Sequence, residues 1–330
     1  MTHRPPPSLW SRPELRRSPL VWLAAAMLGL AAVTTVLAVV DPVPVTGANR
    51  WLKPLKFELS IALYAVTLAW LLTLLRRGRR LAATLGTAAG GLLVVEMVVI
   101  LGAAALGTTS HFNVSTPAHA AAWAVMGVSI SAVWLITAVV GVLLWRSPCG
   151  DAALDLAVRA GVVLGLVGMA VAFVMTSPTP AQLADVEGVA GAHTVGGVDG
   201  GPGLPLLGWS TVAGDLRVPH FVGLHALQGL PLLALGLTLL ARRWPPAASV
   251  LSPTTRHRLV ALAGTGWALA LVMLTWQALA GQPVLAPAGP VLVVGALAAA
   301  LWLAALVVVL LRARRAAADA ATRDRGRAAV

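Results

Sequence analysis

The sequence predicts an all-α membrane protein with eight transmembrane helices in one bundle. Apolar residues make up 58% of its 330 residues and charged residues only 11%, a composition that a soluble domain of this length could not keep in solution. Eight apolar stretches are long enough to cross a hydrocarbon layer, which takes about 20 helical residues. Helices are the expected spanning element, because lipid leaves the backbone of exposed strands and loops without hydrogen-bond partners.

The predicted spans are joined by mostly short connections, with one exception. Residues 177–219 form a long loop on the outer side, whereas 1–19 and 312–330 are a basic and an Arg/Ala-rich tail, both expected in the cytoplasm. The transmembrane domain therefore covers 20–311. In chain order, the spans are predicted near residues 20–40, 58–75, 82–107, 120–145, 156–176, 220–241, 258–280 and 289–311.

The first span follows a basic segment, as a secretory signal does. Its apolar run of about 20 residues exceeds the usual 7 to 15, and no clear small-residue cleavage site follows, so we expect an uncleaved anchor. The single cysteine, Cys149, lies on the predicted cytoplasmic side. One cysteine allows neither a disulfide framework nor a thiol redox pair within the chain.

The net charge of +12 indicates topology, because the basic residues fall at alternate ends of successive spans and form no single soluble patch for nucleic acid. Nineteen of them lie at predicted inner ends and four at predicted outer ends. This bias predicts that both termini are cytoplasmic. The expected partners are membrane lipids and a small-molecule ligand, and no nucleic acid.

Glycine spacing predicts where helices pack closely. Gly86 and Gly90 in the third span, and Gly161 and Gly165 in the fifth, have the four-residue spacing that lets helix backbones approach in lipid. The second and sixth spans share an orientation and begin similarly, with "KFELSIALYAVTLAWLL" and "HFVGLHALQGLPLLALG". The sequence therefore permits a weak parallel repeat of four plus four helices.

The long outer loop combines two kinds of residue. Gly and Pro favour turns, whereas Leu204, Leu206, Leu207 and Trp209 are apolar and unfavourable in water. Loops of this length in a compact protein are usually lids, binding loops or disordered segments. We expect this one to fold back onto the outer mouth of the bundle.

Glu96, in "GLLVVEMVVILGAAALG", is the strongest single indication of a functional site. It lies roughly 16 Å below the outer end of its predicted span, at 1.5 Å per residue. An acidic group near the middle of a bilayer costs roughly 2.5 to 3.5 kcal/mol, so it needs a partner or a neutralising proton. Glu96 is therefore a proton carrier, a ligand anchor or a counter-ion, or else a hydrogen-bonded residue that fixes helix packing.

The stretch "GDLRVPHFVGLHALQ" brings a second polar group into the membrane. His225 and Gln228 are three residues apart and share a helix face, whereas His220 lies about 140° round the helix, near the mouth. Asp215 and Arg217 precede the span, where they can cap its start or pair with each other. The alternative role for this set is to bridge helices.

Two loop segments supply further polar candidates. "GTTSHFNVSTP" holds His111 and Asn113, and "GAHTVGGVDGGPG" holds His193 and Asp199 on glycine-rich backbone that a ligand can approach closely. The glycines do not form a phosphate loop. Such a loop needs a preceding strand, a following helix and a Lys followed by Ser or Thr, and none of these is present. No HExxH, GxSxG or zinc-deaminase pattern is present either, so the sequence leaves open whether the protein is an enzyme.

The segment "NRWLKPLKFELS" contains Lys53 and Lys56, the only lysines of the chain, at the outer start of the second span. Cations at a helix N-terminus oppose the helix dipole, so an anion is expected nearby. The candidates are a lipid phosphate, a substrate carboxylate, Glu58 and Glu96. The alternative is that both side chains extend to the membrane interface.

The strings "WLKPLKFELS", "SHFN", "AHTVGGVDGGPGLP" and "GDLRVPHFVGLHALQ" together resemble a family of bacterial polytopic membrane proteins. The resemblance covers roughly residues 50–230. It implies a multi-pass protein of the bacterial cytoplasmic (inner) membrane and no particular chemistry. The chain is also similar to haem A synthase in having eight spans and buried histidines, but its last two spans contain no histidine, so a paired-histidine haem in each half is not supported.

Three functions are compatible with these residues. The favoured one is a binding or transport protein with an outer-facing polar site for a small anionic or polar ligand. This site would be a cavity lined by the second, third and sixth spans and linked to a proton through Glu96 or His225. The second is a haem- or metal-binding redox protein that uses His111 and His225, with His193 as a further ligand. The third is a lipid-active enzyme with His and Glu as acid and base and the lysines on phosphate. No cofactor is assigned by the sequence.

Overall fold

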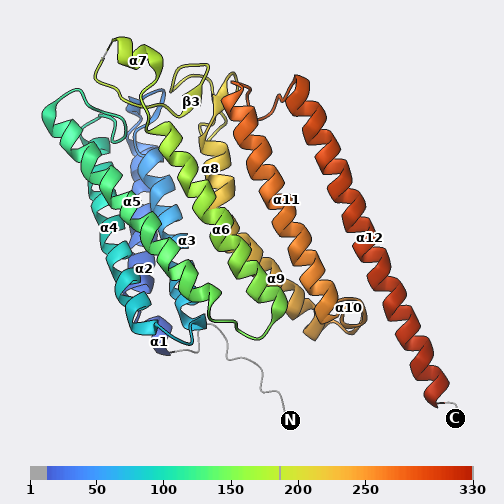
Figure 1. The fold of residues 1–330 in the computed structure, drawn as a ribbon. Helices are drawn as coiled ribbons and strands as arrows, with labels where there is room; N and C mark the ends of the chain where they lie inside the picture. Colours follow the sequence, from blue (N-terminus) through green and yellow to red (C-terminus); the bar gives the residue numbers. More distant parts are fainter. Residues whose placement is uncertain (1–12, 186, 329–330) are drawn as a thin grey trace. The chain divides into compact units, whose positions relative to one another are not determined.

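The computed structural model describes residues 13–185 and 187–328, and it is built mainly of helices (Figure 1). Eight of the described helical segments are long and apolar enough to cross a membrane. The predicted fold class is therefore confirmed, and the protein is an all-α, multi-pass membrane protein. Of the predicted N-terminal tail, residues 1–12 lie outside the described residues, as do 329–330 at the other end.

The spans begin and end within a few residues of the predicted positions, except that the second and last are longer. They are α2 (Pro19–Val40), α3 (Leu52–Leu74), α4 (Arg79–Ala105), α5 (Pro117–Trp145), α6 (Ala152–Met175), α8 with α9 (Arg217–Leu224 and Ala226–Arg243), α11 (Pro253–Leu279) and α12 (Gly289–Ala328). The short elements are α1 (Pro13–Arg16), α7 (Pro180–Ala184), α10 (Pro245–Val250), and the antiparallel strand pairs β1 (Pro44–Val45) with β2 (Ala48–Asn49) and β3 (Thr194–Val195) with β4 (Gly214–Asp215).

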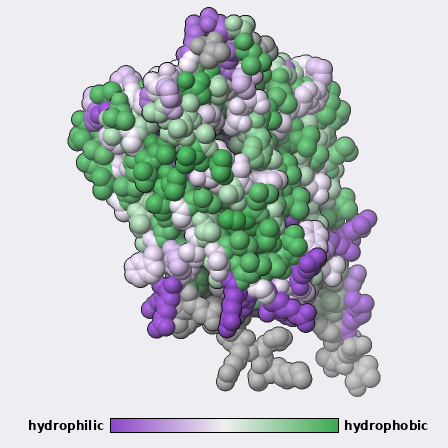
Figure 2. Space-filling model, turned by 60° about the vertical axis from the view of Figure 1, so that its left-hand side comes forward, coloured by the Kyte–Doolittle hydropathy of each residue, from purple (hydrophilic) through white to green (hydrophobic). Residues whose placement is uncertain are grey.

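Large apolar side chains remain exposed along the spans, as expected of helices that face lipid. Val36 on α2 is 60% exposed, Leu135 on α5 56% and Val272 on α11 64%. Figure 2 shows apolar residues covering the middle of the visible face, with hydrophilic residues gathered toward the helix ends. This distribution matches the solvent that each part meets, because lipid surrounds the middle of a span and water its ends.

The chain divides into two compact units with four spans each. The first unit contains α2 to α5 together with the loop segments 173–193 and 198–210. The second contains α6 up to residue 172, segment 194–197 and everything from Thr211 onward, including α8, α9, α11 and α12. The division falls where a four-plus-four repeat would place it, and the repeat itself stays a prediction.

In the first unit, α2, α3 and α4 contact one another through small and apolar residues. The buried positions of α2 recur every three or four residues and face its neighbours. A Cβ atom added at Gly86 of α4 would lie 3.3 Å from Leu20 of α2 and 3.2 Å from Leu72 of α3. The predicted close approach at Gly86 is therefore present, and the glycine lets three helices meet.

In the second unit, α6 and the α8–α9 span approach until their backbones touch. A Cβ added at Gly161 would lie 2.8 Å from the carbonyl oxygen of Ala226, and one at Gly168 only 2.4 Å from the backbone nitrogen of Leu224. The span that α6 contacts is interrupted at His225, which separates α8 from α9. The predicted small-residue packing of the fifth span is thus confirmed.

Part of the long loop folds back onto the first unit, as the sequence led us to expect. The Lys56 ammonium donates a hydrogen bond to the Leu207 carbonyl oxygen over 3.1 Å. Gly47 and Gly200 pack backbone to backbone, and a Cβ on Gly47 would lie 2.3 Å from the Gly200 oxygen. Leu206, with a left-handed φ of 62°, is nevertheless 75% exposed, so folding back does not bury every apolar residue of the loop.

The last span continues well beyond its apolar part. Helix α12 has 40 residues and includes most of the Arg/Ala-rich tail, 312–328, which the sequence suggested as a separate segment. At 1.5 Å per residue such a helix is about 60 Å long, roughly twice the thickness of a hydrocarbon layer. The basic end of α12 therefore projects from the membrane as helix.

Candidate functional site

The predicted polar residues separate into two groups because the chain divides into two units. Lys53, Lys56, Glu58, Glu96, His111, Asn113, His193 and Asp199 belong to the first unit, and Asp215, Arg217, His220, His225 and Gln228 to the second. A common cavity lined by the second, third and sixth spans stays a prediction, since the first two of these spans and the last belong to different units.

Glu96 is buried in α4, with 4% of its surface exposed. It lies nine residues before the helix ends at Ala105, which is about 13 Å along the helix axis. Its Oε1 atom has no hydrogen-bond partner in the described part of the chain. The Lys53 ammonium interacts electrostatically with this carboxyl.

The two lysines have different surroundings. Helix α3 begins at Leu52, six residues earlier than predicted, so both lysines lie within its first two turns. The Lys53 charge acts on Glu96 and also on His111. Lys56 instead bonds to the Leu207 carbonyl of the loop. Lys53 is therefore the lysine that belongs to the buried polar group, and Lys56 holds the loop.

Glu58, a predicted partner of the lysines, faces α2 instead. It is fully buried, with 0% of its surface exposed. The Thr34 hydroxyl oxygen lies at a hydrogen-bond distance of 2.8 Å from its Oε1 atom, and Oε2 has no hydrogen-bond partner among the described residues. Thr34 was not among the residues that the sequence singled out, because one hydroxyl in a long apolar run is a common feature of membrane helices.

His111 lies in a cage of aromatic rings at the loop end of the first unit. Its ring centroid is 5.4 Å from both Phe57 and Trp123, and 6.1 Å from Phe112. Phe112 has a left-handed φ of 63°, and this turn of the backbone directs its buried ring into the cluster. Burial, together with the positive charges of Lys53 and His193, holds the pKa of His111 well below its usual value.

A histidine–carboxylate pair borders this cage. Asp199 accepts from the His193 backbone N–H over 3.0 Å and lies 2.8 Å from the ring Nδ1 of His193. The His193 ring packs edge-on against Phe112, with centroids 4.8 Å apart. The carboxylate therefore fixes the orientation of the imidazole, as such partners do for histidines at metal and catalytic sites.

Asn113 organises the loop around His111. Its side-chain oxygen accepts from the backbone N–H and the hydroxyl of Ser115, over 3.1 and 2.7 Å. Its amide donates to the Thr108 hydroxyl over 3.0 Å. Asn113 is buried, and these bonds account for its conformation, so its observed role is to shape the turn.

In the second unit, His220 bridges two helices. Its Nδ1 lies 2.8 Å from the Gly168 carbonyl oxygen of α6, at the point where the backbones touch. His225 stacks on Phe221 at the helix interruption, with centroids 6.3 Å apart. Gln228 is 7% exposed and its side-chain oxygen has no partner in the described residues. The bridging role considered for this set therefore applies to His220.

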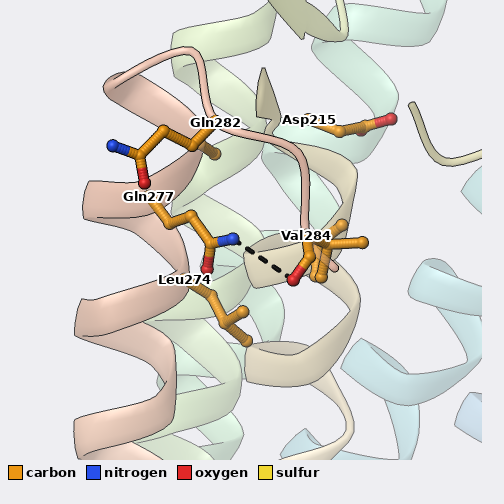
Figure 3. Close-up of a pocket in the computed structure, with 7 residues that line it drawn as sticks. Asp215, Leu274, Gln277, Gln282 and Val284 are labelled. Atoms are coloured by element: carbon orange, nitrogen blue, oxygen red, sulfur yellow. Dashed lines mark hydrogen bonds between the residues drawn. The ribbon is translucent and has the colours of Figure 1, made fainter. Parts of the chain in front are cut away.

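The predicted pair of Asp215 and Arg217 is present at the start of α8, where their side chains form an ion pair of 2.6 Å. A small pocket beside it is lined by Asp215, Leu274, Gln277, Gln282 and Val284, among others (Figure 3). Gln277 spans it by donating to the Val284 carbonyl, and the Asp215 carboxylate points away from Gln277. The space holds about one water molecule, too little for a small-molecule ligand.

Comparison with other proteins adds no assignment: no protein-family model, curated protein or solved structure matches this chain. Within residues 13–185 and 187–328, no three His, Cys, Asp or Glu side chains gather as a metal site. The haem or metal hypothesis with His111, His193 and His225, the lipid-active enzyme and the bacterial family all stay predictions.

The depressed pKa of His111 predicts how stability depends on pH. The unfolded chain binds a proton on this histidine below about pH 6.5, whereas the folded chain resists it. The contribution of neutral His111 is therefore complete above about pH 6.5 and is lost as the pH falls toward the lower folded pKa. We expect the melting temperature of the wild type to fall by a few degrees more between about pH 7.5 and 5.5 than that of His111→Asn. Equal changes in both proteins would contradict this.

Proposed function

We propose that this protein binds a small anion together with a proton and carries both across the membrane. The proposed site lies in the first unit and consists of Lys53, Glu96 and His111. The main support is the Glu96 carboxyl. It is buried, one of its oxygens has no hydrogen-bond partner among the described residues, and it interacts electrostatically with Lys53. An ionisable group inside a span with an identifiable partner is by default a candidate functional site.

Charge balance supplies the mechanism. A carboxylate at this depth is stable only if a cation neutralises it or if it takes up a proton. Without ligand, Lys53 provides the neutralising charge. When a small anion binds the Lys53 ammonium, Glu96 loses that partner, and leaving it charged costs several kcal/mol. The anion therefore binds with uptake of about one proton by Glu96.

The surroundings of Lys53 suit the binding of an anion with uptake of a proton by Glu96. His111 is uncharged near neutral pH, since its pKa is depressed, so it does not compete with Lys53 for the anion. A neutral imidazole has one donor and one acceptor nitrogen, so His111 can donate a hydrogen bond to the bound anion. Phe57 and Trp123 close the sides of the His111 ring. Lysine suits the central position because its compact ammonium binds a single carboxylate or a small anion without the fixed fork of arginine.

The coupling predicts a pH-dependent affinity that Glu96 controls. With acetate, succinate and chloride as probes, calorimetry on the purified protein should show one of them binding up to about tenfold more tightly for each unit of falling pH between roughly pH 8 and 6. Glu96→Gln removes the proton acceptor, so its affinity should not change with pH, and Lys53→Met should abolish binding.

Lys56→Met is the matched control, because it removes the neighbouring lysine that contacts the loop and should keep the pH-dependent affinity. Two results would refute the proposed function. One is that none of the probes binds the wild type at either pH. The other is that Glu96→Gln binds the probe with the pH dependence of the wild type.

We further propose the orientation of the chain in a bacterial inner membrane, with both termini cytoplasmic. The excess of basic residues at one set of helix ends supports it. In a Cys149→Ser background, cysteines at Val198 and Ala316, both exposed positions, should differ in labelling. A membrane-impermeant maleimide should reach residue 198 in intact cells and residue 316 only after the membrane is opened. The reverse result would invert the topology.

A further inference from the structure

The contact between Glu58 and Thr34 contains one hydrogen atom too few if Glu58 is charged. The Thr34 oxygen lies 2.8 Å from Glu58 Oε1 and 3.0 Å from the Leu30 carbonyl oxygen. A hydroxyl has a single hydrogen and can fully satisfy only one of these two acceptors. With an ionised Glu58, two oxygens that only accept would therefore compete for the same hydrogen.

A proton on Glu58 satisfies both contacts. Its Oε1–H then donates to the Thr34 oxygen, and the Thr34 hydroxyl donates to the Leu30 carbonyl. The remaining atom, Oε2, becomes a carbonyl oxygen, and an under-satisfied carbonyl is tolerated in protein interiors far better than an unpaired charge. The unpartnered Oε2 of Glu58 is consistent with this assignment.

A cation is a poorer occupant of the same place. Ca²⁺ and Mg²⁺ collect six or more oxygen ligands, and Zn²⁺ prefers nitrogen and sulfur, whereas this contact offers the two carboxyl oxygens and the Thr34 hydroxyl. The 2.8 Å separation of Oε1 and the Thr34 oxygen is also a hydrogen-bond distance, with a shared hydrogen between them.

The ionisable groups of the neighbouring elements do not neutralise Glu58. In the described part of the chain, Thr34 is the one side chain whose interaction acts on this carboxyl. Asp41, beyond the end of α2, bonds to Arg50 and to the Trp51 indole, and Glu96 of α4 interacts with Lys53. The other ionisable residues on α3 and on the elements packed against it are Glu14, Arg16, Lys53, Lys56, Tyr64, Arg79, Arg80 and His119, and Arg17, Arg76, Arg77 and Arg146 lie within two residues of the ends of these helices.

We propose that Glu58 and Thr34 form a second proton-binding site, between α2 and α3, in which the Glu58 carboxyl is protonated at neutral pH. Both residues lie six positions from the loop end of their helices, about 9 Å deep, and neither is accessible to water. The site does not depend on the proposed exchange at Lys53 and Glu96. Loss of its proton would leave a buried charge and so favour separation of α2 from α3.

Infrared spectroscopy of the full-length protein in lipid nanodiscs tests this directly. The chain has four glutamates, of which Glu14 and Glu187 lie outside the spans. In Glu96→Gln protein made with carboxyl-¹³C glutamate, Glu58 is then the single labelled carboxyl within a span. We expect an isotope-shifted carbonyl band of a protonated acid that persists near pH 8, where exposed glutamates are ionised. The same band should be missing from the Glu58→Gln/Glu96→Gln protein.

Thr34 provides the second measurement, which needs no substitution at Glu58. Thr34→Val removes the partner of the acid hydrogen and should move the band, whereas Thr34→Ser keeps a hydroxyl and should leave it in place. Absence of the acid band near pH 8 in Glu96→Gln protein would overturn the protonated state. A band that Thr34→Val does not move would overturn the pairing. Because Glu96 is already replaced, failure of the anion–proton exchange would not alter either result.

Discussion

The structure depends on one constraint: a charge inside a span must be neutralised by the protein, since lipid supplies no water to solvate it. Among its described side chains, the first unit contains two buried glutamates, and it meets this requirement in two ways. Glu96 has the charge of Lys53 nearby, whereas Glu58 has a threonine hydroxyl and, as we propose, a proton. The two carboxyls thus differ in how they are neutralised. In our proposals, Glu96 exchanges the Lys53 charge for a proton, whereas Glu58 keeps its proton.

The same constraint explains why the two lysines are not equivalent. Lys53 and Lys56 are three residues apart on one helix, so their side chains leave the axis about 60° apart. This difference is enough for Lys53 to act on Glu96 and His111 while Lys56 reaches the backbone of the folded-back loop. The compact, flexible side chain of lysine serves both positions, one as a counter-charge and the other as a support for the loop.

The fold was predictable because hydrophobic length is a strong signal, and each span was found within a few residues except at α3 and α12. Helix α3 begins at Leu52, before the predicted apolar stretch, because Pro54 is favourable in the first turn of a helix and a run of apolar residues does not reveal a polar first turn. Glu96 and the Asp215–Arg217 pair were also predictable, since an acidic residue in an apolar run and opposite charges two residues apart are visible in the sequence.

The partners of these residues could not be predicted. The contacts of Thr34 with Glu58, and of Phe57 and Trp123 with His111, join residues that are 12 to 54 positions apart and depend on how the helices are rotated. The predicted grouping of His225 with Glu96 stays a prediction, because the two residues belong to different compact units. Helix rotation and unit boundaries arise from packing, on which hydrophobic periodicity in lipid-exposed spans gives little information.

In the proposed site, Glu96 holds either a proton or the counter-charge of Lys53. A double-mutant cycle of Lys53→Met and Glu96→Gln, read as the free energy of unfolding at about pH 8 and pH 5, tests it most directly. We expect a coupling on the order of 1 kcal/mol or more at the higher pH, where the carboxylate needs the lysine, and a coupling near zero at the lower pH, where the proton replaces it. Effects that are additive at both pH values would contradict it.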